Sequence, residues 1–541
     1  MNSKNTLFAV FTSIVIIYII GLFPEVGIDS AKYAGVSRYI IDSGDWLHMH
    51  IYGKPYLQKP PFMFWLNAIS FQIFGMSMFA FKLPTLLFTF ASIFALFKFT
   101  KLYYSKNTGI IAAVMYASSQ MLFLYHNDLH TDALMTANVV IGVSLIAHYL
   151  STKQLWQFIL GFVFIGFAVS TKGPIGLAVA AFAVGGHLLI SKNWKQIFSP
   201  IWLLAIPILS LALFPTLKGL YDQFGWEGIK FFFWTNNAGR IAGSHGMNKD
   251  YAFYLHTLIY IYLPWSAYAF ITFYNHIRSI VKNKKAIFNR NEFYTYSALL
   301  IFGSILSVSG QKAPHYLYPA IPFLTVIVAD FINTSIAKNA SGILKAFSIG
   351  RYIMLGLSLI VVILAVTFVF STSNPLIWIV LLIGTILIIY ILVKSDDVLT
   401  KLIIPLVISS LMLNFVLNYH FMPKAFSYHG AIRACNMYDE LANDDELLLT
   451  YKYKQFETFF YAKNVSERAM DIDNLEKYKR KSNFWIITNQ EGKSEVDSVY
   501  QDRISRTEIF KHKKISQMDG KFLNPRTREN SLKKIYLIKV E

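Results

Sequence analysis

The sequence has little charge and almost no cysteine. Charged residues make up 15% of its 541 positions, whereas an ordinary soluble domain carries about 25%. Cys435 is the single cysteine, which excludes a disulfide within the chain and a cysteine-based metal site, and we expect it to be a small buried residue. The P-loop, G-x-S-x-G and H-E-x-x-H motifs are also missing, so the sequence offers no common nucleotide-binding, serine-hydrolase or zinc-protease pattern.

Apolar residues dominate instead. Hydrophobic residues account for 55% of the chain, aromatic residues for 16%, and the mean hydropathy is +0.43. A helix needs about 20 apolar residues to cross a bilayer, and the apolar runs predict a polytopic α-helical membrane protein with about thirteen such helices. Their ranges are 7–23, 83–100, 109–125, 133–150, 156–169, 174–190, 201–217, 252–274, 295–310, 316–336, 352–371, 375–393 and 402–420. The first run lacks an A-x-A-like cleavage site after it, so we expect it to be a retained helix.

The charge pattern predicts how the chain crosses the membrane. The formal net charge is +19, and most of the excess lies before residue 424. With thirteen spans, the lysines and arginines of the short loops collect on one side, which the positive-inside rule makes cytoplasmic. The N-terminus is then cytoplasmic and the C-terminus lies outside. The positive charge can attract anionic lipid headgroups. We expect no nucleic-acid partner, because the sequence shows no basic patch on a soluble domain.

The last part of the chain differs in kind. Residues 424–541 are polar, and HGAIRACNMYDELAN is typical of an amphipathic helix. ELLLTYKY, NFWIITN and KKIYLIKV are typical of short strands. We therefore predict two domains, a transmembrane domain over 1–423 with a large outer loop at 24–82, and a small extracytoplasmic α/β domain over 424–541.

Carboxylates occur where the predicted outer loops meet the membrane. Asp29, Lys32 and Tyr33 stand at i, i+3 and i+4, so a helix places them on one face. Asp132 opens another predicted span. Ionisable groups at this depth are costly and are functional candidates, although a helix N-cap or a solvated loop residue is the plainer interpretation, above all for Asp128.

Basic residues occur on the same side. Lys59 lies in Q-K-P-P, where two prolines fix the backbone that follows it, and a lysine held there suits a phosphate as a compact charge. Further cations and hydroxyl donors on this side are Lys32, Arg240, Lys312, Tyr33 and Tyr316. Interfacial lysines whose heads reach for water are the alternative interpretation. Cations suit a phosphate leaving group and a carboxylate can activate an acceptor, so together they favour group transfer from a lipid-linked phosphate.

An ordered set of motifs resembles a known family. The set is DSAKYAGVSRY with SGDW at 29–46, GKPYLQKPP with WLNA at 53–68, LHTD at 129–132, TKG at 171–173, LPW at 263–265, and Lys312, Pro314, Tyr316, Pro319 and Pro322. It resembles the bacterial aminoarabinose transferases, which are grouped with protein O-mannosyltransferases in the GT-C glycosyltransferase superfamily. The resemblance covers roughly residues 5–335.

The resemblance implies a fold, a reaction and a set of site residues. The implied fold is GT-C, and the implied reaction transfers a sugar, with inversion, from a polyprenyl-phosphate carrier at the outer face of the bacterial inner membrane. Carried over by position, Asp29 is the catalytic carboxylate and Asp132 the second carboxylate. The carrier phosphate is held by Lys59, Lys32, Tyr33, Arg240, Tyr316 and Lys312. The acceptor is a lipid A-type glycolipid, another envelope glycan or a protein.

Some positions depart from the family pattern. Ser30 replaces a glutamate, Lys32 an arginine, and Gln58 the glutamate before the key lysine. That glutamate and a loop histidine resemble a metal pair in aminoarabinose transferases, whereas Gln58 and Asn237 are poor zinc ligands. We therefore predict no zinc there and no cofactor, leaving a divalent cation elsewhere open. The isolated histidines His126, His130 and His245 are interpreted as loop residues.

Two other classes of function remain as alternatives. A transporter or flippase of lipid-linked sugars would line a path near the membrane midplane with charges, but the mid-span regions here are almost free of charge. An assembly factor that presents the outer domain to a partner would leave the ordered motifs unexplained. A glycosyltransferase accounts for both observations.

Overall fold

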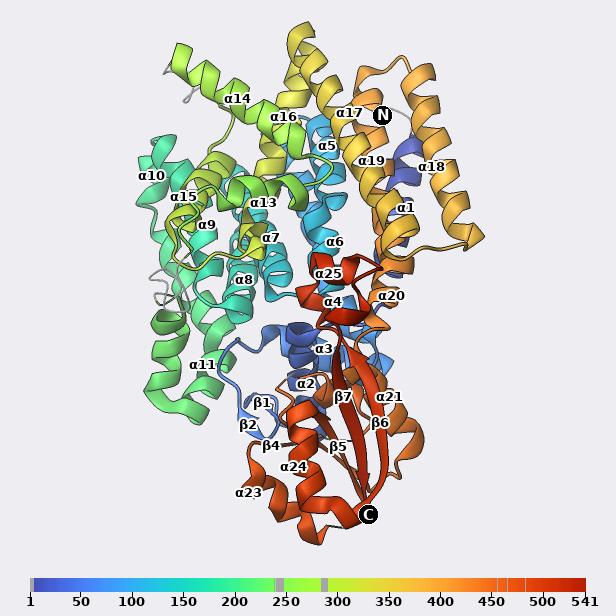
Figure 1. Cartoon of the computed structure of the whole chain (residues 1–541). Helices are drawn as coiled ribbons and strands as arrows, with labels where there is room; N and C mark the ends of the chain where they lie inside the picture. The colour runs from blue at the N-terminus through green and yellow to red at the C-terminus, as the bar shows by residue number, and fades with distance from the viewer. Residues whose placement is uncertain are drawn as a thin grey trace.

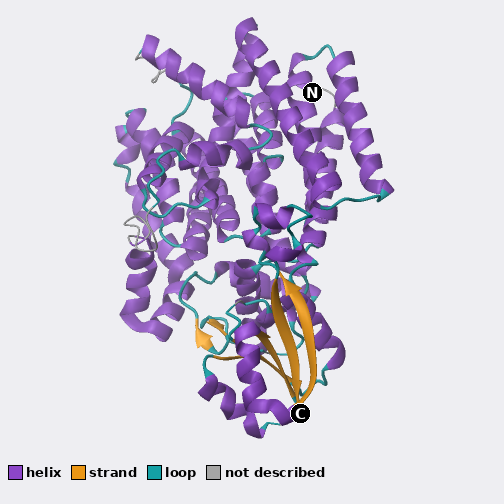
Figure 2. Ribbon diagram, in the orientation of Figure 1, coloured by secondary structure: helices purple, strands orange, loops and turns teal. Residues whose placement is uncertain are grey.

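The computed structural model describes residues 4–237, 239, 248–283, 290–454, 456–464, 466–481 and 483–541. Long helices run roughly parallel through one part of the molecule, and the strands gather at its other end (Figure 1, Figure 2). The N-terminus lies at the helical end and the C-terminus at the strand end (Figure 1). Arg240 and His245 lie outside the described residues, so their predicted roles stay predictions.

The helical part contains most of the predicted spans. Its helices are α1 (Lys4–Ile20), α4 (Met78–Tyr103), α5 (Lys106–Ala117), α6 (Gln120–Asn127), α7 (Thr131–Thr152), α8 (Leu155–Lys172), α9 (Ile175–Ile190), α10 (Trp194–Ile197), α11 (Ala205–Lys230), α13 (Phe253–Ile261), α14 (Ser266–Lys282), α15 (Tyr294–Val308), α16 (Ile321–Ala337), α17 (Ser341–Ile363), α18 (Pro375–Lys394) and α19 (Val398–Val416). Among the described residues, eight helices are long and apolar enough to cross a membrane, or up to nine if the bent pair α5 and α6 forms one span. The count of thirteen therefore stays a prediction.

One predicted span is interrupted. The range 252–274 was expected to be a single helix, but α13 ends at Ile261 and α14 begins at Ser266. Pro264 lies in the break, and because proline has no backbone N–H it cannot continue a helical hydrogen-bond ladder.

The predicted outer loop 24–82 is itself folded. It contains α2 (Ile28–Ser43), a small hairpin of β1 (His50–Ile51) and β2 (Lys54–Pro55), and α3 (Phe62–Phe74). Apolar residues of α2 and α3 pack into a shared hydrophobic cluster that also contains Phe460 from the C-terminal part of the chain. The loop and helix α22 (Thr458–Tyr461) of the C-terminal part therefore share a core, in the part of the molecule where α2, α3 and the C-terminal strands meet (Figure 1).

Residues 424–541, here called the C-terminal sheet region, form a mixed sheet with helices against it. The strands are β3 (Leu447–Tyr451), β4 (Glu467–Ala469), β5 (Phe484–Asn489), β6 (Ile504–His512) and β7 (Lys533–Val540), in the order β4-β3-β5-β7-β6. The helices of this part of the chain are α20 (Met422–Phe426), α21 (Gly430–Leu441), α22 (Thr458–Tyr461), α23 (Ile472–Glu476), α24 (Gln490–Tyr500) and α25 (Gly520–Leu523). The predicted helix corresponds to α21 and the three predicted strands to β3, β5 and β7. Cys435 is buried, as expected.

Helices α7 and α8 make the contact that matters most for the candidate site. A two-residue loop joins them, so they run antiparallel. A Cβ added to Gly142 of α7 would lie 2.8 Å from Ile165 Cγ1 and 2.9 Å from the Gly161 carbonyl of α8. Small residues let helix backbones approach this closely. The first turn of α7 therefore lies beside the last turn of α8.

Candidate functional site

A cavity of about 130 Å³ lies where α7, α8, α9 and α15 converge. Its charged lining residues are Lys59, Asp132 and Lys172. The rest of its wall is formed by Met135, Ile175, Asn236, Asn237, Phe302, Ile305, Leu306, Ser309, Tyr316 and Pro319. Tyr316 belongs to the 3₁₀ turn η4 (Pro314–Ala320). The cavity thus combines two cations, one carboxylate and a mostly apolar wall.

Asp132 and Lys172 form an ion pair inside this cavity. Asp132 stands in the first turn of α7, and Lys172 is the last residue of α8. Their side chains are only 3% and 12% exposed. The Lys172 ammonium also lies 4.9 Å from the centre of the Tyr316 ring, a distance at which the ring face attracts a cation. A lysine held by a carboxylate and a ring is well placed to meet an anion.

Two histidines lie next to this pair. One ligating atom each of His130, Asp132 and His315 lie within 4.8 Å of one another, and the two imidazole rings are 4.8 Å apart. His130 Nε2 is 3.3 Å from Asp128 Oδ2, and the Ser30 hydroxyl donates to Asp128 Oδ1 at 2.6 Å. Ser30 therefore connects the start of α2 to the loop before α7.

The charges around His130 shift its protonation. Burial lowers the pKa of His130, but the hydrogen bond and charge of Asp128, together with Asp132 and Asp29, outweigh burial and raise it above its ordinary value. Burial raises the pKa of Asp128, but His130 and the Ser30 hydrogen bond outweigh that effect and lower it. The two groups thus favour each other's charged form.

Asp29 lies in the first turn of α2 and outside the cavity lining. Its side chain is 56% exposed, and the Lys32 ammonium donates to Asp29 Oδ1 at 2.8 Å. Lys32 also reaches Gln58 Oε1, the residue before Lys59, at 3.5 Å. Burial raises the pKa of Asp29, but Lys32 outweighs it and lowers the pKa below its ordinary value. Asp29 is therefore an ionised carboxylate that faces open space.

The other predicted site residues fall into three groups. Lys59 and Tyr316 line the cavity with Asp132. Tyr33 is buried, with its ring centre 5.5 Å from the Lys32 ammonium. Lys312 points elsewhere, because its ammonium donates to the Asp250 carbonyl at 2.8 Å and lies over the Tyr251 ring.

Comparisons with known proteins show which families and folds the chain is similar to. A profile of the dolichyl-phosphate-mannose-protein mannosyltransferase family matches residues 58–218. The chain is 26% identical over 328 residues to the undecaprenyl phosphate-alpha-4-amino-4-deoxy-L-arabinose arabinosyl transferase of Yersinia enterocolitica, which is 59% of this chain and 57% of that protein. The same-named protein of Wigglesworthia glossinidia brevipalpis is 25% identical over 346 residues, 62% of this chain and 60% of that protein. The chain is thus similar in sequence, over somewhat more than half of its length, to proteins named as aminoarabinose transferases. The matches span somewhat over half the length of these relatives.

The fold comparison covers nearly the whole chain. The structures of ArnT from Cupriavidus metallidurans, apo and bound to undecaprenyl phosphate, superpose with TM-scores of 0.75 and 0.76. Each match covers 99% of this chain and 98% of ArnT at 13% identity. The chain therefore has the ArnT-like GT-C fold, as the resemblance implied.

The positions that resemble a metal pair in the aminoarabinose transferases do not fit zinc here. The Asn237 side chain donates to the Phe232 carbonyl at 3.0 Å, and the Gln58 side-chain oxygen faces the Lys32 ammonium. Neutral amides engaged in this way are weak ligands for zinc. Among the described residues, one group could approach a cation, namely His130, Asp132 and His315. The Lys172 ammonium already neutralises the carboxylate of that group.

Sequence reasoning gave no role to three residues that the structure brings together. His130 was interpreted as a loop residue, Lys172 appeared only within the TKG motif, and His315 was given no role. One signal could have found Lys172. Two spans joined by a short loop are antiparallel, so a charge that opens the first lies at the same level as a charge that ends the second. No comparable signal joins His130 to His315, because η4 lies far along the chain.

Proposed function

We propose that the chain is an inverting glycosyltransferase that moves a sugar from a polyprenyl-phosphate carrier to an envelope acceptor. The observation that carries the proposal is the cavity in which Lys59 and Lys172 lie beside Asp132 and an apolar wall. Lysine is a compact charge that suits a phosphate, and an apolar wall suits the first part of a lipid chain.

The relatives support the choice of donor. They carry names that specify transfer of aminoarabinose from undecaprenyl phosphate, and ArnT has been seen with undecaprenyl phosphate bound. Because Ser30, Lys32 and Gln58 depart from the family pattern, the proposal leaves the sugar open. A lipid A-type glycolipid or another envelope glycan is the proposed acceptor.

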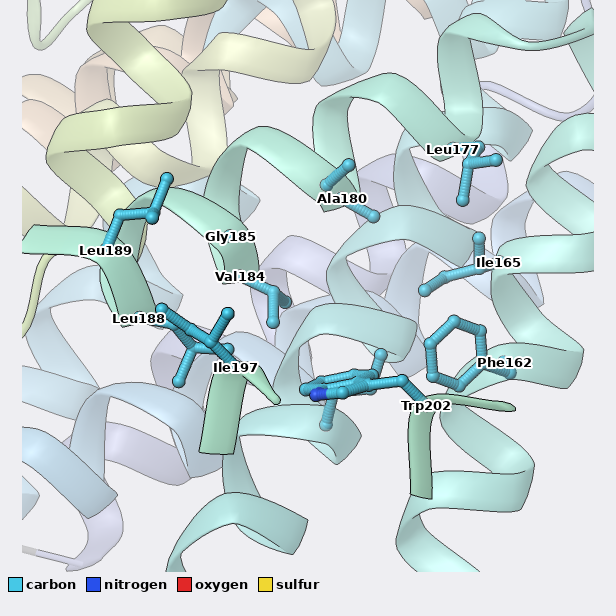
Figure 3. A pocket seen from close by; sticks show the side chains of 12 residues that line it. Phe162, Ile165, Leu177, Ala180, Val184, Gly185, Leu188, Leu189, Ile197 and Trp202 are labelled. Carbon is cyan, nitrogen blue, oxygen red and sulfur yellow. The ribbon is translucent and has the colours of Figure 1, made fainter. Parts of the chain in front are cut away.

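A second cavity offers room for the carrier's tail. It measures about 390 Å³ and is lined by apolar side chains of α7, α8 and α9 and by Trp202 (Figure 3). Ile175, at the start of α9, lines the site cavity, and Leu177 to Leu189 of the same helix line the apolar one. In our proposal the phosphate lies at Lys59 and the prenyl chain follows α9.

The proposed reaction is a single in-line displacement. The acceptor oxygen attacks the anomeric carbon while the bond from that carbon to the carrier phosphate breaks. The acceptor proton passes to Asp29, and the bonding electrons leave with the phosphate. Lys59, with Lys172, stabilises the charge that develops on the departing phosphate. Asp132 keeps Lys172 in place for this role.

The proposed location follows from the same reaction. The protein would be a multi-pass protein of the bacterial inner membrane, with a cytoplasmic N-terminus and the C-terminal sheet region in the periplasm. Helix α2, which carries Asp29, and the β1–β2 hairpin lie at the same end of the molecule as the sheet region, which suits a site at the outer face (Figure 1). The similarity to the mannosyltransferase family makes a protein acceptor the second candidate.

An in-frame deletion in the source bacterium tests the proposal. Envelope glycolipids and glycoproteins of the deletion strain and its parent would be compared by mass spectrometry. We expect one sugar mass to disappear and to return with the wild-type protein but not with Asp29→Asn, which keeps the shape and removes the base. Asp444→Asn is the matched control, because that carboxylate is fully exposed in the sheet region.

The identity of the altered molecule decides between the candidates. A missing sugar on lipid A or another glycan supports the glycolipid acceptor, and a missing sugar on protein supports the second candidate. If no glycan changes and a lipid-linked precursor accumulates, the protein is a transporter and the proposed reaction is wrong. If the folded Asp29→Asn variant transfers sugar at a near-normal rate, Asp29 is not the base that accepts the acceptor proton.

A further inference from the structure

Lys32 lies between the candidate site and the C-terminal sheet region. Its ammonium is 2.8 Å from Asp29 Oδ1 on one side. On another side it lies 5.4 Å from the centre of the Phe456 ring, which belongs to the sheet region. The Lys32 side chain is only 11% exposed. A ring face within about 6 Å of an ammonium attracts it, so Phe456 restricts where Lys32 can point.

The segment that carries Phe456 is fastened to α2 at several points. The Tyr461 hydroxyl accepts from the Val26 N–H at 2.8 Å and donates to the Val26 carbonyl at 3.1 Å, three residues before Asp29. The Arg38 guanidinium of α2 donates to the carbonyls of Ala462 and Lys463. These bonds tie the segment to the chain just before α2 and to Arg38 within the helix.

Aromatic contacts hold the same segment from the outer loop. The Arg468 guanidinium of β4 lies 4.6 Å from the Tyr52 ring centre, 5.1 Å from Phe456 and 5.2 Å from Phe459. Tyr52 belongs to the turn between β1 and β2. The Phe460 ring packs 5.9 Å from Phe71 of α3. The segment is therefore packed against the outer loop as well as hydrogen-bonded to it.

We propose that the C-terminal sheet region is part of the transferase machinery, and that Phe456 is a positioning residue that holds Lys32 on Asp29. The inference rests on the proposed function, and it assigns a purpose to the sheet region. The Asp29 side chain is more than half exposed, so packing alone does not fix its orientation, and its ion pair with Lys32 does. Lys32 anchored by Phe456 keeps the carboxylate ionised and oriented toward the acceptor. Phe456 itself touches no substrate in this proposal.

A cysteine reporter tests the positioning without any assumption about the substrate. Asp29→Cys places a thiol beside Lys32. The other cysteine, Cys435, is buried, so we expect little labelling of it, and the wild-type protein measures that background. A nearby ammonium lowers a thiol pKa, and only the thiolate reacts with maleimide. The other charged groups that face this position, His130 and Asp128 from the loop before α7, stay unchanged. The labelling rate of the full-length protein would be measured across pH.

We expect Phe456→Leu in the Asp29→Cys protein to move the labelling profile to higher pH and to slow labelling near neutral pH about two- to fivefold, the factor that one cation–ring contact supplies. Phe456→Tyr keeps a ring and restores the profile. Phe510→Leu is the matched control, because Phe510 is a buried ring of β6 in another part of the sheet region. An unchanged profile in Phe456→Leu, or an equal shift in Phe510→Leu, would overturn the proposal.

Activity gives the second readout, with undecaprenyl phosphate-linked 4-amino-4-deoxy-L-arabinose as donor and lipid A as acceptor. We expect Phe456→Leu to lower kcat about two- to fivefold and to leave the KM for the donor unchanged, since Lys59 and Lys172 are untouched. If the wild-type protein transfers no sugar, aminoarabinose transfer to lipid A is wrong for this protein, while the labelling profile still decides the role of Phe456. If the wild-type protein is active and Phe456→Leu matches it in kcat and in labelling, only the positioning role fails.

Discussion

Asp132 and Lys172 face each other across the contact of two antiparallel helices, and both side chains are almost completely buried. Neither charge has bulk water to solvate it, so each depends on the other. The pair also borders the cavity that holds Lys59. An anion that enters the cavity meets a lysine whose position is already fixed, which avoids the cost of ordering that side chain on binding.

The first prediction concerns the stability of this pair. Removing one partner leaves a buried charge without compensation, which costs about 3–5 kcal/mol, whereas removing both leaves none. We expect Asp132→Asn and Lys172→Met each to lower the unfolding temperature of the detergent-solubilised protein strongly. The double variant should be more stable than the sum of the two losses predicts. Additive losses would mean that the two side chains do not interact in the folded protein.

The second prediction concerns the carrier phosphate. A hydrogen bond to a charged group contributes about 1.5–3 kcal/mol, so we expect Lys59→Ala to raise the KM for the polyprenyl-phosphate donor about ten- to a hundredfold. Lys59→Arg should retain part of the affinity, because it keeps the charge on a longer side chain. Initial rates at varied donor concentration measure the effect.

A nearby lysine supplies the control for that measurement. Lys54 is exposed on the β1–β2 hairpin of the same outer loop and is not part of the cavity lining. Lys54→Ala should leave the KM for the donor at its wild-type value. If Lys59→Ala and Lys54→Ala behave alike, the phosphate is held elsewhere in the protein.

The elements of the fold were largely predictable from hydropathy, because helices that cross a membrane are long apolar segments of the sequence. The break between α13 and α14 was missed because flanking apolar residues on both sides of Pro264 continue the run. Strand β6 was missed for a different reason. It is an edge strand with mostly exposed residues, and its sequence ISRTEIFKH lacks the apolar content of β3, β5 and β7.

Part of the candidate site was predictable, from the resemblance for Lys59, Asp132 and Tyr316, which line one cavity, and from spacing along one helix for Asp29 and Lys32. Asp29 and Lys32 stand one turn apart, and the structure shows α2 bringing them into contact, as predicted. The contacts of His130 with His315 and of Lys32 with Phe456 join parts of the chain that only tertiary folding brings together. No local pattern encodes such pairs.

The third prediction is a pH dependence of stability that arises from His130. Its pKa is raised in the folded protein, so its contribution to stability is complete below the unfolded value of about 6.5 and is lost as the pH rises through the folded value. We expect His130→Gln to be less stable than the wild type near pH 6, and the difference to shrink as the pH rises. Unfolding temperatures measured in detergent between about pH 6 and pH 9 test this.

Another histidine of the outer part of the protein separates this effect from a general one. His50 lies on β1 and is not part of the group formed by His130, Asp132 and His315. His50→Gln is the control for the loss of a histidine, and its unfolding temperatures are measured over the same pH range. If the difference in unfolding temperature between the wild type and His130→Gln stays constant with pH, Asp128 does not favour the protonated form of His130.

The fourth prediction is that the proposed sugar transfer needs no divalent metal ion. The cluster of His130, Asp132 and His315 offers two nitrogen ligands and one oxygen ligand within 4.8 Å, which resembles the ligand set of a catalytic zinc. However, a metal ion at Asp132 would have to displace or approach the Lys172 ammonium, and two cations on one carboxylate repel each other. We therefore expect dialysis of the purified protein against a chelator to leave its activity intact, measured together with its metal content. The contrary result would be that the chelator abolishes activity and that one divalent metal restores it in the wild type but not in His315→Ala. A cation would then be bound in this cluster, next to Lys172.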